Sequence, residues 1–288
     1  MAEITAKMVK ELREMTGAGM MECKKALAEA EGDMDRAVDV LRTRGLAAVA
    51  KKAGRATNEG TVSAMVSADG KVGAVVELNC ETDFVGMNEK FKAYADKITT
   101  AALATKPADV AALLAAEIEG ETVEAVVADC IHVMGENSQL ARVGILEGDA
   151  VVPYIHMGGK IGVLVSFKVE GVDASAAEFQ AMGRDVAMQV AAMNPISATP
   201  EAVPAEVIEH EKEIYRAQAA ESGKPEKFWD NIINGRVNKF YAEQCLTNQV
   251  FVKAADGKQS VSAYVDSVAK ELGGSVKIEA FLRFALGE

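Results

Sequence analysis

One pattern occurs twice in the chain and constrains its fold more than any other feature. DGKVGAVVEL (residues 69–78) and GGKIGVLVSF (158–167) share the order Gly-Lys-β-branched-Gly-x-x-Val. A strand-like run, TVSAMVSA in one case and VVPYIHM in the other, precedes each copy. The Asp-Gly or Gly-Gly step between run and copy is typical of a β-hairpin. The repeat therefore predicts two similar antiparallel hairpins.

A helical segment follows each copy, near residues 88–104 and 174–193. This shared order makes duplication a simpler explanation than chance. We therefore expect two similar α+β core subdomains, each with an antiparallel sheet and helices, in residues 56–150 and 151–200. The alternating strand in VKIEAFLRFALGE is expected to return to the second sheet within a closing segment, 247–288, that also holds a C-terminal module.

Three short helices are predicted in the first 45 residues. Apolar residues recur at helical spacing in the first of them: Ile4, Met8, Leu12 and Met15. The glycines of residues 16–19 break that helix, and Asp33 is expected to cap the third one. The small and charged segment 51–60 is typical of a linker. Residues 1–55 therefore form the predicted N-terminal domain.

Two long polar helical stretches follow residue 200. They cover 204–222 and 225–246 and are joined by Ser-Gly-Lys-Pro, which stops one helix and starts the next. The short connection favours an antiparallel helical hairpin in residues 201–246. Its apolar positions are sparse, so the hairpin either packs on something else or projects. A homodimer through this hairpin and a monomer are equally compatible with the sequence.

Charge and hydropathy exclude several partner classes. The chain of 288 residues has a net charge of −12, whereas phosphate binding needs clustered Lys and Arg. Residues 1–55 carry a net +2 and the remainder −14. The sequence contains no apolar run of about 18 residues, and its opening lacks the apolar core of a signal peptide. We expect a cytoplasmic protein without a direct nucleic-acid or membrane partner.

No catalytic constellation is apparent in the sequence. It contains no P-loop pattern, and the three histidines lack metal-ligand spacing, so we expect neither cofactor nor metal site. The scattered cysteines Cys23, Cys80, Cys130 and Cys245 form no CxxC pair and are expected to be reduced and half-buried. A thiol hydrolase using Cys80 with His132 or His156 as base is conceivable, but no activating motif accompanies it.

Four features are typical of contact surfaces. Thr82-Asp83-Phe84-Val85 follows a strand, and Phe84 is either a core residue behind a capped turn or an aromatic anchor presented on a loop. The other three features are Met20-Met21-Glu22-Cys23-Lys24-Lys25, the helix terminus Met134-Gly135-Glu136-Asn137, and His156. Each also has a structural explanation: core filling, a plain C-cap and a hydrogen-bonding histidine.

Four segments carry a resemblance to a known family: TGAGMMECKKAL, ELNCETDFV, MGENSQLARV and FLRFALGE. They closely resemble segments of the elongation factor Ts family, the guanine-nucleotide exchange factors of elongation factor Tu. The likeness runs essentially end to end in the same order. It implies an α+β fold with a ubiquitin-associated-like three-helix domain, two similar core subdomains, a projecting antiparallel helical hairpin and a C-terminal module.

The resemblance also implies contact residues. In the family, the Thr-Asp-Phe motif inserts between helices of the partner's nucleotide-binding domain, which places Phe84 in an apolar pocket with Asp83 beside it. The segment Thr82 to Val85 would then displace Mg²⁺ from the bound nucleotide. Further partner contacts are implied for Met20, Met21, Lys24, Met134, Gly135, His156 and Val252. Val250 stands where the family usually has proline.

The function implied is that of a translation elongation factor. It would bind GDP-bound elongation factor Tu and catalyse exchange of GDP for GTP without covalent chemistry, so it would not be an enzyme. The alternative from another class is a non-exchanging interaction scaffold with a ubiquitin-associated-like module. Measuring GDP release from a purified GTPase discriminates between the two.

Overall fold

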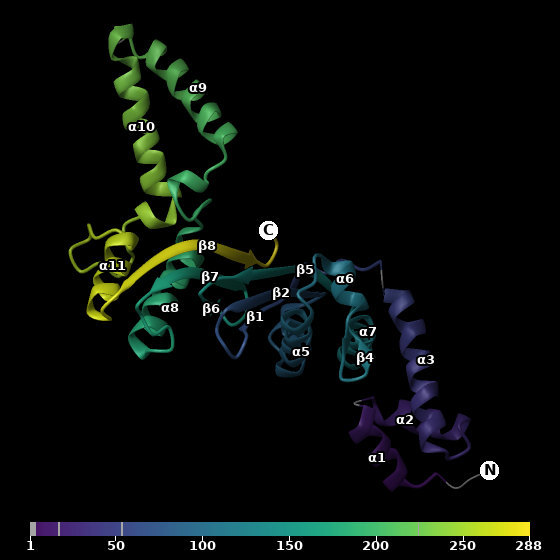
Figure 1. The fold of residues 1–288 in the computed structure, drawn as a ribbon. Coiled ribbons are helices and arrows are strands. Elements are labelled where there is room, and N and C mark those ends of the chain that lie inside the picture. Colours follow the sequence, from purple (N-terminus) through teal and green to yellow (C-terminus); the bar gives the residue numbers. More distant parts are fainter. Residues whose placement is uncertain (1–3, 17, 53, 224) are drawn as a thin grey trace.

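The protein is an elongated α+β molecule, described here from a computed structural model. The structure describes residues 4–16, 18–52, 54–223 and 225–288, and the side chains of residues 45–51 are not described. Figure 1 shows the three N-terminal helices at one end, the strands in the middle and the pair α9 and α10 projecting at the other end. The predicted fold class is confirmed.

The N-terminal module consists of α1 (Ala6–Thr16), α2 (Met20–Glu29) and α3 (Met34–Lys52). Asp33 Oδ1 accepts a hydrogen bond from Arg36 N at 3.0 Å, which confirms the predicted cap. The third helix is longer than expected, because it continues into the segment predicted as a linker. Gly17 and Ala53, in the predicted break and linker, lie outside the described residues.

The prediction that Met15 belongs to the apolar face of the first helix is wrong. Met15 is 65% exposed, whereas Val9 and Leu12 are buried. The core-facing side of α1 is centred between Val9 and Leu12, which puts Met15 at its edge. The buried core of the module comes from all three helices: Leu12, Cys23, Ala26, Leu27, Ala37 and Leu41.

The two predicted hairpins are present, and each gains a third strand. The first sheet has the order β1 (Glu59–Val66), β2 (Val72–Cys80) and β5 (Ser138–Glu147), all antiparallel. The second has the order β6 (Ala150–His156), β7 (Ile161–Glu170) and β8 (Ser275–Ala285). The predicted return of the C-terminal strand is confirmed, but β5 is not evident from the sequence pattern.

The bulges in the two sheets support a duplication. The pairing of β2 with β5 shifts register between Glu77 and Leu78, and that of β7 with β8 shifts between Ser166 and Phe167. These pairs occupy equivalent positions of the repeated pattern. A β-bulge re-aims side chains and increases local twist, so both sheets bend at the same place.

Glycines of the repeat allow the two sheets to pack face to face. Gly73 and Gly162 occupy equivalent positions in the two copies. A Cβ atom on Gly73 would lie 2.8 Å from the Val151 side chain, and one on Gly162 would lie 2.3 Å from that of Val62. Between the sheets a small apolar core forms: Val62, Val75, Val151 and Leu164.

Helices cover the outer faces of both sheets. The first sheet packs on residues of α5 (Glu89–Thr105), α6 (Val110–Ala115) and α7 (Val123–Met134), and the second on α8 (Ala177–Met193) and α11 (Val261–Glu271). A two-stranded ribbon, β3 (Glu117–Ile118) and β4 (Glu121–Thr122), precedes α7. The predicted helices near 88–104 and 174–193 correspond to α5 and α8, which confirms both.

The projecting hairpin consists of α9 (Ala205–Glu221) and α10 (Trp229–Gln244). Ile208 and Ala219 of α9 and Ile233 and Val237 of α10 are buried. The flanking Val203 and Cys245 join Ile208, Ile233 and Val237 in one apolar cluster. The second helix starts later than predicted, because Pro225 opens a 3₁₀ turn, Glu226–Phe228. Two further 3₁₀ turns, Pro200–Ala202 and Leu246–Asn248, flank the hairpin. Lys224, in the predicted joint, lies outside the described residues.

Candidate partner-binding site

The segment Thr82–Val85, which we call the wedge, forms most of a one-turn helix after β2. Thr82 caps α4 (Asp83–Gly86), and its Oγ1 accepts from Val85 N at 3.5 Å. Val85 is half-buried and packs against the apolar core between the first sheet and α5, α6 and α7. Phe84 is 80% exposed. The interpretation of Phe84 as a core residue is therefore wrong, and its ring is presented to solvent beside the exposed Asp83.

The loop after α7 holds the start of the wedge. The Glu136 carboxylate accepts from Thr82 N at 3.0 Å through Oε2 and from Thr82 Oγ1 at 2.7 Å through Oε1. Gly135 caps α7 with φ 77°, a left-handed conformation that glycine adopts readily, so the chain turns sharply into Glu136. The structure thus brings Met134 and Gly135 next to the wedge.

The second subdomain reaches the same end of the first sheet. A Cβ atom on Gly86 would lie 2.6 Å from the carbonyl oxygen of Gly60, so the end of α4 packs directly on the start of β1. Val62 N then donates to Gly159 O, in the turn after β6, at 2.7 Å. His156 lies at the end of β6, half-buried, with its Nδ1 2.9 Å from Tyr154 Oη.

The N-terminal module presents exposed methionines close to α7. Met20 and Met21 are 55% and 65% exposed at the start of α2, and Lys24 is exposed one turn later. Glu22 of the same turn lies 3.7 Å from His132 Nε2 on α7. A cleft of about 580 Å³ separates the module from α7, lined by Met15, Leu41, Arg42, Ala125, Asp129 and His132 among others.

Val252 lies on the second subdomain and is fixed to α8. Its N–H donates to Gln189 Oε1 at 2.8 Å, and Gln189 Nε2 donates to Val250 O at 3.1 Å. Gln189 is fully buried, so its amide fixes the backbone of residues 250–252, whereas the side chains of Val250 and Val252 remain about half exposed. The predicted contact residues are therefore spread over the N-terminal module and both subdomains.

The exposure of several large apolar side chains was not predicted from the sequence. Among the described residues outside the predicted sites they include Met87, Ile155, Met157, Met193, Ile196 and Val250. Each lies at or just beyond the end of a helix or strand or in a nearby turn. Large apolar residues at such ends are a usable signal, because the core normally recruits side chains from the middle of an element.

The cysteines do not form a reactive site. All four are buried and free, which corrects the expectation that they are half-buried. Burial, helped by the negative charge of Glu136, raises the pKa of Cys80 to about 12. Its Sγ donates to Thr82 O at 3.1 Å. A buried thiol with a raised pKa is a poor nucleophile, which argues against the thiol hydrolase.

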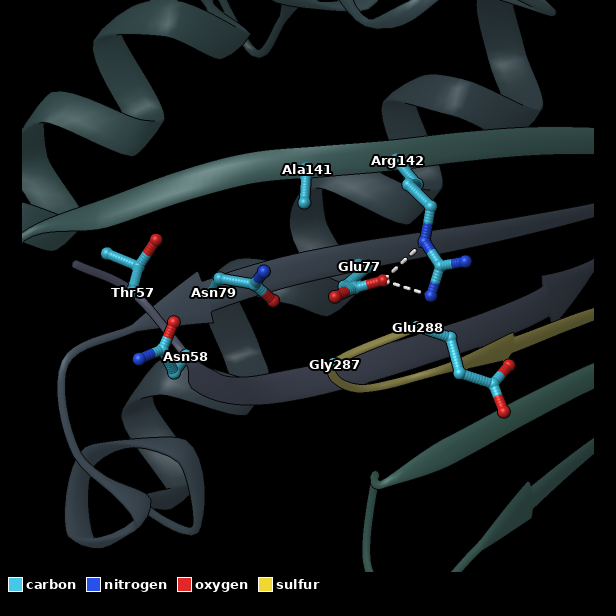
Figure 2. Close-up of a pocket in the computed structure, with 8 residues that line it drawn as sticks. All are labelled: Thr57, Asn58, Glu77, Asn79, Ala141, Arg142, Gly287 and Glu288. Carbon is cyan, nitrogen blue, oxygen red and sulfur yellow. Dashed lines mark hydrogen bonds and ion pairs between the residues drawn. The ribbon is translucent and has the colours of Figure 1, made fainter.

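A polar pocket of about 520 Å³ lies where the end of the chain meets the first sheet. Figure 2 shows Glu77 and Arg142 pointing toward each other within it. Arg142 Nη2 also donates to the Ala285 carbonyl of β8 at 2.7 Å. The Glu77 carboxylate is paired with Arg142 within the first sheet, so this pair offers no free acid or base. The bond from Arg142 to Ala285 links this sheet to the second one.

Neither a metal-binding cluster nor a membrane-spanning helix occurs in the part of the chain that the structure describes. Within residues 4–16, 18–52, 54–223 and 225–288, no group of three or more His, Cys, Asp or Glu is arranged to hold a metal ion. In the same part of the chain, every helix is too short or too polar to cross a membrane.

Comparison with known proteins gives the family. A family model described as elongation factor TS matches residues 81–288. Elongation factor Ts of Trichlorobacter lovleyi is 47% identical over 291 aligned residues, covering 99% of this chain and 93% of the relative. Elongation factor Ts of Clostridium botulinum strain ATCC 19397 is 46% identical with the same coverage. The chain therefore belongs to the elongation factor Ts family and is a translation elongation factor.

Proposed function

We propose that this protein binds GDP-bound elongation factor Tu and catalyses the exchange of GDP for GTP. The observation that carries the proposal is the exposure of Phe84, 80%, on a capped turn held by hydrogen bonds. A large aromatic ring held rigidly in water is typical of a binding hot spot. The wedge inserts between helices of the partner's nucleotide-binding domain, with Phe84 in an apolar pocket and Asp83 beside it.

Exchange follows from linkage between the two ligands of the GTPase. Mg²⁺ bridges phosphate oxygens of the bound nucleotide and neutralises their charge. Insertion of the wedge displaces this Mg²⁺ and weakens GDP binding. GDP must in turn weaken binding of the factor to the same degree. The bound GDP leaves unaltered, so the protein acts without covalent chemistry and is not an enzyme.

The remaining predicted residues form the rest of the interface. Met20, Met21 and Lys24 contact the partner's nucleotide-binding domain from an N-terminal domain in residues 1–55. The first subdomain, 56–150, adds Met134 and Gly135 beside the wedge. His156 and Val252 contact the partner from the second subdomain, which comprises 151–200 and 247–288. This activity belongs to the cytoplasm.

Release of a fluorescent GDP analogue from purified elongation factor Tu tests the proposal. Catalytic amounts of this protein should accelerate release strongly in Mg²⁺-containing buffer. Binding without acceleration would instead support the interaction scaffold. A second experiment uses excess Mg²⁺, which should slow the catalysed release because it opposes displacement of the ion.

A further inference from the structure

The wedge cannot hold its own conformation. The helix α4 has four residues, Asp83–Gly86, and a single helical turn is unstable in water without outside support. Phe84 itself contributes little, because it is 80% exposed. The orientation of its ring therefore depends on contacts that other parts of the chain make with the wedge.

Glu136 makes the contacts that define where the turn begins. Its two carboxylate oxygens accept from the backbone N–H and the hydroxyl of Thr82, at 3.0 and 2.7 Å. Hydrogen bonds to a charged carboxylate are the strong class. The same hydroxyl accepts from Val85 N at 3.5 Å. Because its proton is committed to Glu136, its lone pairs remain available to cap the turn that carries Phe84.

The position of Glu136 is fixed in turn by its neighbours. Asn137 N donates to Glu81 Oε1 at 2.7 Å, and Asn137 Nδ2 donates to Arg55 O at 2.9 Å. Asn137 is 6% exposed. Two carboxylates thus connect the loop after α7 with the segment after β2. Glu136 of the loop accepts from Thr82, and Glu81 beside Thr82 accepts from Asn137 of the loop.

We propose that Glu136 is a positioning residue for nucleotide exchange, acting through Thr82 to hold Phe84 in the orientation that enters the partner. This role rests on the proposed function. It also explains why the wedge and the loop after α7 lie together: the α7 loop supplies the support as well as the neighbouring surface of Met134 and Gly135.

The first test compares Glu136→Ala with Glu119→Ala in the full chain. Both remove one negative charge from the first subdomain, but Glu119 is exposed and its partner Lys97 keeps Glu121. Rates of fluorescent GDP release are measured against factor concentration. We expect Glu136→Ala to lower the maximal rate about tenfold, because a misoriented Phe84 ring loses part of its contact with the partner's pocket. The half-saturating concentration should change less than about threefold, since the other contacts remain.

The rescue variant is Glu136→Gln. Its carbonyl still accepts from Thr82 N, and its amide can donate to the Thr82 hydroxyl, so the maximal rate should recover most of the loss. Glu119→Ala should match the wild type. Equal rates for Glu136→Ala and wild type would overturn the proposal, as would a loss that appears only in the half-saturating concentration.

A double-mutant cycle separates positioning from general damage. If Glu136 acts through Phe84, then adding Glu136→Ala to Phe84→Ala should cause little further loss of rate. A full tenfold additional loss overturns the positioning role while leaving the proposed function intact. If Phe84→Ala alone leaves GDP release unchanged, both the proposed function and this inference fail.

Hydrogen exchange gives a readout independent of the partner. In Glu136→Ala, the amides of Thr82 and Val85 should exchange at least about tenfold faster than in the wild type, because their acceptor is lost or misplaced. The amides of Val75 and Val76, in the centre of β2, should be unchanged. Unaltered exchange at Thr82 and Val85 would overturn the proposal.

Discussion

The guanidinium of Arg142 and the carboxylate of Glu77 are joined through Nε at 2.6 Å and Nη2 at 2.5 Å. Glu77 is 3% exposed. Arg142 also donates to the Ala285 carbonyl and stacks over the Phe284 ring at 4.5 Å. One side chain on β5 therefore neutralises a buried acid on β2 and contacts β8, so it ties the two sheets together.

Arg142→Met should destabilise the protein by about 3 kcal/mol or more, because it leaves the buried Glu77 carboxylate unpaired. Urea unfolding followed by circular dichroism measures the change. The control is Lys168→Met, which breaks an exposed pair with Asp149 and should cost far less stability than Arg142→Met. Adding Glu77→Gln to Arg142→Met should recover part of the loss. Similar small losses in both single variants would contradict this role.

Phe84→Ala should slow catalysed GDP release by roughly 30-fold or more, the effect of losing a hot spot worth about 2 kcal/mol. The fold should be unaffected, with a stability change within about 0.5 kcal/mol, because the side chain is exposed. The matched control is Phe228→Ala, another exposed phenylalanine, in the projecting hairpin. Unchanged release in Phe84→Ala, or equal losses in both variants, would remove the basis for the wedge.

Gly86→Ala should cost about 1 to 3 kcal/mol of stability, because its methyl group would meet the backbone of Gly60, which no side-chain rotation relieves. Gly235→Ala should instead increase the stability of the protein. That glycine is exposed within α10 with open space around it, and alanine favours a helix by about 0.5 to 1 kcal/mol. Thermal unfolding measures both stability changes, and a neutral Gly86→Ala would show that α4 does not pack tightly on β1.

Stability should fall as the pH rises above 9. Burial is the main cause that raises the pKa of Cys80 and of Cys130 from 9.0 to about 12. Between these values the unfolded thiols lose protons and the folded ones keep them, so unfolding is favoured as the pH increases. Below pH 9 the thiols are protonated in both states and have no effect.

Urea unfolding at pH 8 and pH 10 measures this dependence. In Cys130→Ala the loss of stability between the two pH values should be about 1 kcal/mol smaller than in the wild type. The stability lost through the cavity at the missing sulfur is the same at both pH values, so it cancels in the difference between them. An identical pH dependence in both proteins would refute the assignment.

The fold was largely predictable because the sequence repeats its local signals. The turns at Asp69-Gly70 and Gly158-Gly159 and the alternating C-terminal strand each carry strong local patterns. The strand β5, Ser138–Glu147, does not, because most of its side chains are only partly buried and polar residues interrupt the alternation.

The candidate site was less predictable. The turn that exposes Phe84 begins at Thr82, which is bonded to Glu136, 54 residues further along the chain. No local pattern encodes such a contact, so the residues left the core and surface interpretations open. The longer third helix was missed for a related reason: the small and charged residues of a linker are also compatible with a helix.

The pairing of β7 with β8 has a consequence for biosynthesis. In the chain, α8, the projecting hairpin and α11 separate these two strands. A nascent chain therefore holds β7 as an open sheet edge until β8 has been synthesised. The first sheet, complete at β5, can form much earlier and offers its apolar face as a template for the second.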